Sequence, residues 1–225
     1  MSLLDMIGPV MIGPSSSHTA GACRIALLAR HSLIREPGRA TLTLHGSFAK
    51  TAKGHGTDLA LAAGLLGYYP DDARLPEALK LAATQGLDIT FSTKDLGDVH
   101  PNTVSIALES AEEKVEMVGS SLGGGSVRIF KVNDFEVNFS GAHHTLLLEH
   151  EDKLGVIARV ARLIADDEVN IATLHCARRK RGGSAMMSVE VERRLSQYVL
   201  DYLTHVPYVR WLRLLPNVMD GEHGR

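Results

Sequence analysis

Hydroxyl and imidazole side chains are concentrated in the segment 13–19, which reads Gly-Pro-Ser-Ser-Ser-His-Thr. Serines ahead of an apolar helical run are natural N-caps, and the start of a helix is a ready site for an anion such as a carboxylate. The residues alone fit an ordinary helix cap as well as a binding site. His18 titrates near neutral pH, so it can hold or pass a proton. The candidate carboxylate donors beside it are Ser15, Ser16, Ser17 and Thr19.

A second histidine stands in the segment 51–58, Thr-Ala-Lys-Gly-His-Gly-Thr-Asp. The glycines on both sides of His55 allow positive φ angles or a close approach of the backbone to a ligand. A histidine on such a loop is exposed for chemistry, although a bond to Asp58 or to backbone is an equally good structural interpretation. The other candidates for substrate contact here are Lys53, Thr57 and Asp58, of which Thr57 and Asp58 are also expected to cap the next helix.

A third polar element is the turn His100-Pro101-Asn102. The fixed φ of proline stiffens the turn, and the Asn102 amide can both donate and accept hydrogen bonds. We expect His100 and Asn102 either to face the active-site cleft or to serve the turn alone. Ser47, directly after Gly46, is a further candidate for the cleft. The run Gly123–Gly125 lacks the lysine of a P-loop, so we interpret it as a tight bend.

Composition excludes several classes of protein. The formal net charge of the 225 residues is −2, so neither nucleic acid nor an anionic membrane is an expected partner. No apolar stretch is long enough for a membrane span, and the N-terminal segment does not read as a signal peptide. The only cysteines, Cys23 and Cys176, have no zinc-like spacing, so no metal site is expected in this chain. Two isolated thiols fit a reducing cytoplasm.

The pattern of residues 1–140 mixes strands with helices and contains hairpins, which favours an α+β fold. A helix is expected from about Ser15 to His31, followed by a strand that we predict over Ala40–Phe48 because apolar and polar residues alternate there. The other expected elements are a loop over 50–57, helices over 58–66 and 75–85, strands over 88–92, 103–110 and 114–118, and a hairpin formed by 126–132 and 135–138.

The pattern restarts beyond residues 140–144, and we predict a second domain over 144–216. Its order, βαββαβ, is that of the ferredoxin-like fold. The basic cluster 178–181 is interpreted as a solvated hairpin tip, and the polar tail from Asn217 is expected to be frayed. The expected strands cover 144–150, 169–176, 184–191 and 209–215, and the expected helices cover 155–165 and 195–203.

These motifs resemble two known families. The segments 13–19, 51–58, 100–103 and 121–126, in this order, resemble the β domain of the bacterial iron–sulfur L-serine dehydratases, over residues 1–140. That domain also looks like the allosteric substrate-binding domain of some D-3-phosphoglycerate dehydrogenases. Residues 144–215 resemble an ACT domain, although Leu154 stands where proline is common.

The resemblance implies a β subunit that deaminates L-serine to pyruvate and ammonia together with an α subunit. It implies a [4Fe–4S] cluster whose ligands are cysteines of that α subunit, and it makes His18 and His55 the catalytic candidates. It also implies an ACT domain that pairs into a homodimer and binds an amino acid, by hypothesis L-serine. The expected effector contacts are His150, Asp152, Leu154, Gly155, Val156 and Asn170.

Two other classes of function are alternatives. A non-catalytic amino-acid-binding regulatory protein is the main alternative, but a pure sensor has no need for two histidine-bearing motifs beside hydroxyl donors. A serine hydrolase is disfavoured because the sequence lacks the Gly-x-Ser-x-Gly turn that presents a nucleophilic serine.

Overall fold

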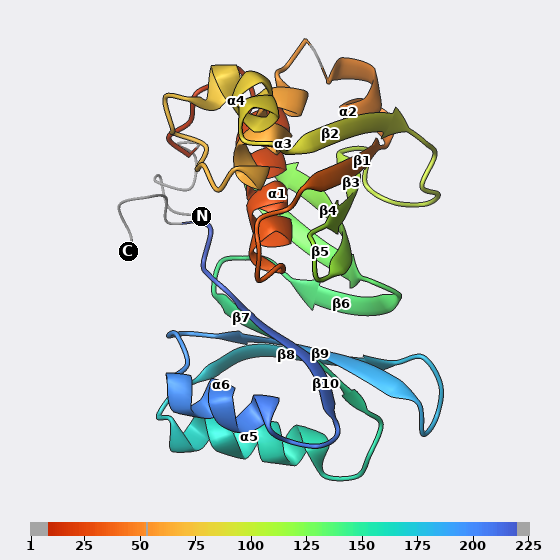
Figure 1. The fold of residues 1–225 in the computed structure, drawn as a ribbon, viewed down its shortest axis with the longest axis vertical. Helices are drawn as coiled ribbons and strands as arrows, with labels where there is room; N and C mark the ends of the chain where they lie inside the picture. The colour runs from red at the N-terminus through yellow and green to blue at the C-terminus, as the bar shows by residue number, and fades with distance from the viewer. Residues whose placement is uncertain (1–8, 53, 220–225) are drawn as a thin grey trace.

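The computed structural model describes residues 9–52 and 54–219, which form two units stacked on each other (Figure 1). The N-terminal unit, up to residue 139, holds a six-stranded sheet, and the C-terminal unit, residues 144–215, holds a four-stranded sheet. Each unit combines helices with a sheet, so the predicted α+β class is confirmed.

The six-stranded sheet has the order β2-β1-β3-β4-β5-β6. Only β1 and β2 run parallel, and every other neighbouring pair is antiparallel. In β1 the side chains of Ala40, Leu42 and Leu44 are buried and those between them are not, which is the alternation of a sheet with one covered face. The strands are β1 (Arg39–Leu44), β2 (Asp88–Thr93), β3 (Thr103–Glu109), β4 (Lys114–Gly123), β5 (Ser126–Val132) and β6 (Phe135–Phe139).

Helix α1 (Ala22–His31) is the central helix of the N-terminal unit, and residues 22–29 are all buried. A single wide helical turn, the π-helix η2 (Ser16–Gly21), leads directly into it. Helix α3 crosses α1 closely, because a Cβ on Gly64 would lie 2.3 Å from the Cys23 carbonyl oxygen. The other helices are α2 (Gly46–Thr51), α3 (Thr57–Leu65), the short 3₁₀ helix η3 (Leu75–Glu77) and α4 (Ala78–Thr84).

One predicted strand is too long. The strand expected over Ala40–Phe48 ends at Leu44, and Gly46, with φ 54°, turns the chain into α2. Ser47 therefore lies on a helix, and α2 also takes the first part of the loop that we predicted over 50–57. The bend at Gly123–Gly125 is present between β4 and β5, with positive φ at all three glycines.

The C-terminal unit has the predicted βαββαβ order, with strands arranged β10-β7-β9-β8. Both helices cover the face of the sheet that points away from the N-terminal unit (Figure 1). Helix α5 buries Val156, Val160 and Ile164, which lie four residues apart on one face. The elements are β7 (His144–Glu151), α5 (Val156–Asp166), β8 (Ile171–Arg178), β9 (Ser184–Val191), α6 (Gln197–Thr204) and β10 (Val209–Leu215).

The segment after β10 returns to the N-terminal unit. Val218 is fully buried in the core of that unit, and its N–H donates to the Gly141 carbonyl at 2.9 Å. The prediction of a frayed tail is therefore wrong up to Met219, because an apolar side chain there finds a buried site. The rest of the tail, 220–225, lies outside the described residues. Within the part that the structure describes, no helix has the length and apolar character needed to cross a membrane.

Candidate functional site

His18 projects from η2 and is held by hydroxyl groups at both ring nitrogens. Ser15 caps the turn, because its Oγ accepts from the His18 N–H at 3.3 Å. The Nδ1 atom of His18 lies 3.0 Å from Ser17 Oγ and 3.4 Å from Ser15 Oγ. Its Nε2 atom lies 3.1 Å from Ser47 Oγ. These contacts fix the ring without any charged partner.

Ser47 reaches His18 because α2 starts against the turn at residues 100–102. The Ser47 N–H donates to the Pro101 carbonyl at 2.8 Å. A Cβ on Gly46 would lie 2.6 Å from the same oxygen, and the backbone there has a positive φ, so the close approach requires glycine. The turn at residues 100–102 therefore contacts the site through the Pro101 backbone carbonyl.

His55 lies beside His18. The two ring centroids are 5.0 Å apart, and the planes are tilted by 43°. His55 is exposed, whereas His18 is half-buried, with Phe48 packed edge-on at 5.3 Å. Two backbone contacts place the His55 loop: its N–H donates to Thr51 O at 3.0 Å, and its carbonyl accepts from Thr19 Oγ1 at 3.5 Å. Motifs separated by more than thirty residues thus present two imidazoles side by side.

The surroundings of His18 favour its neutral form. Burial lowers the pKa of His18 from its ordinary value, and the charge of nearby His55 lowers it further. A neutral imidazole carries one N–H donor and one acceptor nitrogen, and the acceptor can take a proton. The hydroxyls around it can donate to a carboxylate. This arrangement suits removal of a proton from a small anionic substrate.

Two buried hydroxyls, on Thr57 and Ser121, lack a hydrogen-bond partner among the described residues. Thr57, a predicted contact, is fully buried at the start of α3, and its Oγ1 has no hydrogen-bond partner among the described residues. Ser121 was not predicted. Its Oγ is also buried without a described partner, and it packs where a Cβ on Gly21 would lie 2.0 Å away. Two adjacent serines stand within the largely buried strand β4, and this pair is the sequence signal that could have pointed to Ser121.

Among the described residues, His100, Asn102 and Asp58 have other partners than the two histidines. The Nδ1 atom of His100 accepts from the Asn102 N–H at 3.1 Å, and the Asn102 carbonyl accepts from Ser121 N at 2.9 Å, so both serve the turn. Asp58 accepts from the Leu59 N–H at 2.9 Å and lines a separate hollow of about 370 Å³. Ser16 is the first residue of η2. Lys53 lies outside the described residues.

In the C-terminal unit, the expected effector contacts have partners inside the unit. Asp152 accepts from the Gly182 N–H at 3.0 Å and from Arg178 Nη1 at 3.2 Å. These bonds, the Gly182 one first, lower the pKa of Asp152. Asn170 donates to Glu192 at 3.2 Å. Asp152 thus fastens the β8–β9 hairpin to the loop before α5.

The other expected effector contacts differ in exposure. His150 is buried, with Nδ1 2.7 Å from the Glu151 carbonyl oxygen and Nε2 3.8 Å from Cys176 Sγ. Leu154 is fully exposed. Gly155 has φ 83° and is the N-cap of α5, and Val156, the first residue of that helix, is buried. The loop therefore offers an exposed apolar side chain and a helix start.

The cysteines do not fit an iron–sulfur cluster. Cys23 is buried in α1, its thiol donates to the Tyr68 carbonyl at 3.1 Å, and burial raises its pKa. Cys176 lies on β8 in the other unit, and burial also raises its pKa. Metal-bound thiols must be deprotonated, which this burial opposes. No cluster of metal-ligating side chains occurs among the described residues.

Comparison with known proteins gives consistent matches. Residues 2–131 match the family model of the serine dehydratase beta chain, and residues 146–210 match that of the AHAS small subunit-like ACT domain. A probable L-serine dehydratase beta chain of Bacillus subtilis is 44% identical, covering 92% of this chain and 94% of its own length. An L-serine dehydratase beta chain of Peptoniphilus asaccharolyticus is 41% identical, covering 87% and 89%. A D-3-phosphoglycerate dehydrogenase of Bacillus subtilis is 26% identical, covering 60% of this chain and 26% of its own length.

Proposed function

This chain belongs to the family of serine dehydratase beta chains, and from that membership we propose that it contributes part of the active site of an L-serine dehydratase. The partner would be an α subunit, and the reaction would yield pyruvate and ammonia. The observation that supports this proposal best is the pair of imidazoles, His18 and His55, whose ring centroids lie 5.0 Å apart beside serine hydroxyls. In this proposal residues 1–140 are the catalytic β domain and residues 144–216 are the ACT domain.

The proposed chemistry is a β-elimination. A proton leaves Cα of L-serine, the Cβ–O bond breaks and water departs, and the resulting enamine hydrolyses to pyruvate and ammonia. His18, neutral because its pKa is lowered, is suited to accept the Cα proton. His55, exposed beside it, can bind the substrate or exchange that proton with solvent. The hydroxyls of Ser15, Ser17 and Ser47 are placed to bind the carboxylate.

The family resemblance also implies a [4Fe–4S] cluster. Because the two cysteines lie in different units and burial raises the pKa of both thiols, this chain does not fit as its ligand. We assign the cluster to the α subunit. Two free cysteines agree with a reducing cytoplasm as the proposed location.

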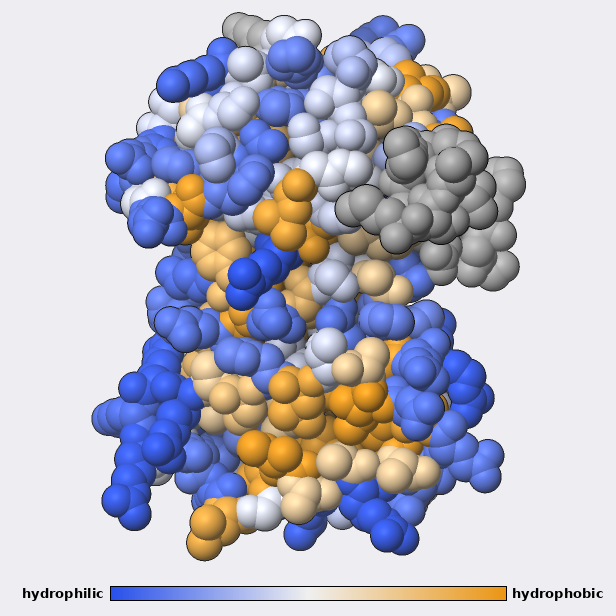
Figure 2. Space-filling view, turned by 180° about the vertical axis from the view of Figure 1, so that it is seen from behind, coloured by the Kyte–Doolittle hydropathy of each residue, from blue (hydrophilic) through white to orange (hydrophobic). Residues whose placement is uncertain are grey.

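For the ACT domain we propose L-serine sensing by a homodimer. β8 is an edge strand of its sheet, so one row of its backbone groups is open for pairing with a second copy. Leu174 on β8 and Ile157 on α5 are large apolar side chains that stay exposed. Figure 2 shows apolar side chains gathered on the C-terminal unit. Size measurements at several concentrations test the homodimer, and a monomer at all of them would contradict it.

Reconstitution tests the main proposal. The chain is mixed under anaerobic conditions with a cysteine-rich α partner, and pyruvate formation from L-serine is followed. We expect turnover only when both chains are present. An α chain that is fully active alone would contradict the proposal. Binding of L-serine by this chain without any effect on turnover would instead support a non-catalytic amino-acid-binding protein.

A further inference from the structure

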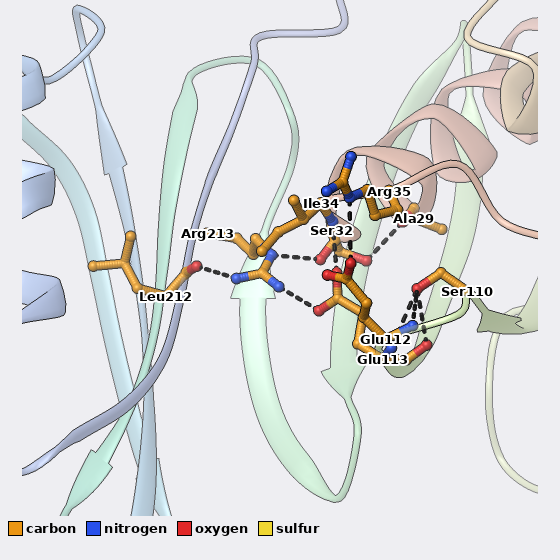
Figure 3. A network of polar contacts seen from close by, with 9 residues as sticks. All are labelled: Ala29, Ser32, Ile34, Arg35, Ser110, Glu112, Glu113, Leu212 and Arg213. Carbon is orange, nitrogen blue, oxygen red and sulfur yellow. Dashed lines mark hydrogen bonds and ion pairs between the residues drawn. The ribbon is translucent and has the colours of Figure 1, made fainter.

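Strand β10 contacts the end of α1, although the two belong to different units. The Nε atom of Arg213 donates to the Ser32 carbonyl at 2.9 Å, and Ser32 is the C-cap of α1. The same guanidinium donates to the Glu113 carboxylate and to the Leu212 carbonyl (Figure 3). Arg213 thus ties its own strand, the β3–β4 turn and the end of α1 to one another.

The Arg213–Glu113 pair is sheltered from solvent. Their side chains are only 15% and 17% exposed. The other oxygen of Glu113 accepts from the Ile34 N–H at 2.6 Å, which fixes the chain just after α1. Removing one partner of a sheltered ion pair leaves the other charge uncompensated, so the end of α1 depends on Arg213 more than on a surface contact.

The segment after β10 continues along the same helix. Val218 packs where Gly141 approaches Leu28, since a Cβ on Gly141 would lie 2.9 Å from Val218 and 3.0 Å from Leu28. Farther along, the Met219 carbonyl accepts from Arg24 Nη2 at 3.0 Å. The α1 residues contacted are Arg24, Leu28 and Ser32. They are four residues apart, so they share one face of the helix.

Helix α1 leads from these contacts to the candidate catalytic group without a break. Its first residue, Ala22, still bonds back through its N–H to Thr19 O in η2, the turn that carries His18. Residues 22–29 of the helix are all buried, and α3 crosses it at backbone contact. Packed interiors transmit displacement because they cannot deform locally. We therefore expect a shift at Ser32 to be passed to η2.

We propose that Arg213 is a positioning residue for His18, acting from the C-terminal unit through α1. The inference rests on the proposed function in taking His18 as a catalytic group. It also gives the ACT domain a route to the site, because β10 pairs with β7, and Tyr208 O at the entry to β10 accepts from the Glu151 N–H at 2.9 Å. Glu151 opens the loop where the effector is expected, so movement of that loop reaches Arg213 along one strand.

The test compares Arg213→Met with Arg210→Met. Arg210 lies on the same strand and is exposed, and it bonds to Ser184 and Glu151 within the C-terminal unit, so its loss matches the charge change without touching α1. Hydrogen–deuterium exchange of the whole chain is measured for the peptide covering 16–31. We expect Arg213→Met to accelerate exchange in that peptide roughly 2- to 30-fold, the range of coupling seen when a linking contact is removed. Arg210→Met should leave the peptide unchanged.

In the reconstituted enzyme, Arg213→Met should lower kcat by a similar factor while KM for L-serine changes less, because the serine hydroxyls of this chain that bind the substrate carboxylate are still present. Unchanged exchange at 16–31, equal effects in both variants, or acceleration spread evenly over the whole chain would each overturn the inference. The exchange result stands even if reconstitution yields no turnover, which would count against the proposed function alone. If Arg213→Met does not fold, Val218→Ala should give the same pattern more weakly, because it removes only two methyl groups from the segment that packs beside the same face of α1.

Discussion

The two regions expected to bind amino acids differ in what their polar groups are doing. Around His18 the partners are hydroxyls and a second imidazole, and two hydroxyls close by, on Thr57 and Ser121, lack partners among the described residues. In the C-terminal unit Asp152 already has an arginine and a backbone N–H. The first region keeps donors and acceptors ready for a ligand, whereas the second uses them to hold a hairpin.

The same contrast gives opposite meanings to two lowered pKa values. Burial and a neighbouring charge lower the pKa of His18 by disfavouring its charged form. Hydrogen bonds lower the pKa of Asp152 by satisfying its charged form. Perturbed groups of the first kind are typical of catalysis, and those of the second kind are typical of structure. A ligand at Asp152 therefore meets a carboxylate whose charge is already satisfied through Oδ2 by Arg178 and the Gly182 N–H.

The largest expected effect removes one imidazole from the first region. His55→Ala should reduce kcat of the reconstituted enzyme by roughly 10²–10⁴-fold, the usual contribution of general acid–base help. His205→Ala is the matched control, since that exposed histidine caps α6 in the C-terminal unit through the Asp201 carbonyl. Near-normal kcat in His55→Ala would remove His55 from the chemistry and leave the two regions alike.

The next effect tests whether the first region depends on its scaffold. Gly64→Ala would place a Cβ 2.3 Å from the Cys23 carbonyl oxygen and 2.7 Å from the Ala26 side chain, so α1 and α3 must separate. Overpacking of this kind costs about 1–3 kcal/mol, and the backbone atom cannot move aside as a side chain can. Gly38→Ala is the control, because nothing lies within 4 Å of its Cβ position. Urea denaturation measures both, and equal stabilities would contradict the close crossing.

Local patterns predicted most of the elements. The apolar spacing of α5 and the short apolar runs of β7 and β9 set out the βαββαβ order, because α5 follows the helical period and the buried runs have the length of strands. The end of β1 was mistaken because Gly46 turns the chain against Pro101, a residue far away in sequence. The buried Val218 was missed for the same reason, as its site is made by α1.

In the candidate site, too, contacts within one motif were predictable from the sequence and contacts between distant motifs were not. Residues within one motif, such as Ser15, Ser17 and His18, were predictable because a helix cap places them together. The pairing of His18 with His55 was only implied, since no local rule joins two motifs. Arg213 could not be anticipated at all. In the sequence it is one of several arginines, and its role comes from the contact between units.

A smaller effect tests whether L-serine binds at Asp152 in the second region. If Asp152 meets the ammonium of L-serine, the ligand competes with Arg178 for the negative charge of that carboxylate. Arg178→Met should therefore bind L-serine roughly two- to fivefold more tightly. That range corresponds to the weak strength of an exposed ion pair. Arg181→Met, at the tip of the same exposed hairpin, should not change affinity. Calorimetric titration of the whole chain with L-serine measures the affinity of each variant. Weaker binding in Arg178→Met would place the arginine, and not Asp152 alone, in contact with the ligand.

The smallest effect is the titration of His18 itself, followed by NMR of its ring protons in the isolated chain. Its midpoint should lie below 6.5, because burial disfavours the imidazolium, and the groups facing it are the hydroxyls of Ser15, Ser17 and Ser47 and the ring of His55. His55→Asn removes the second cause and keeps the first, so the midpoint should rise but stay under 6.5. Between the folded-state midpoint of His18 and its ordinary value of 6.5, the unfolded chain binds one more proton than the folded chain, so stability falls as pH drops through this window. A midpoint above 6.5 in the wild type would mean that His18 has a partner satisfying its charge, as Asp152 has, and the contrast between the regions would disappear.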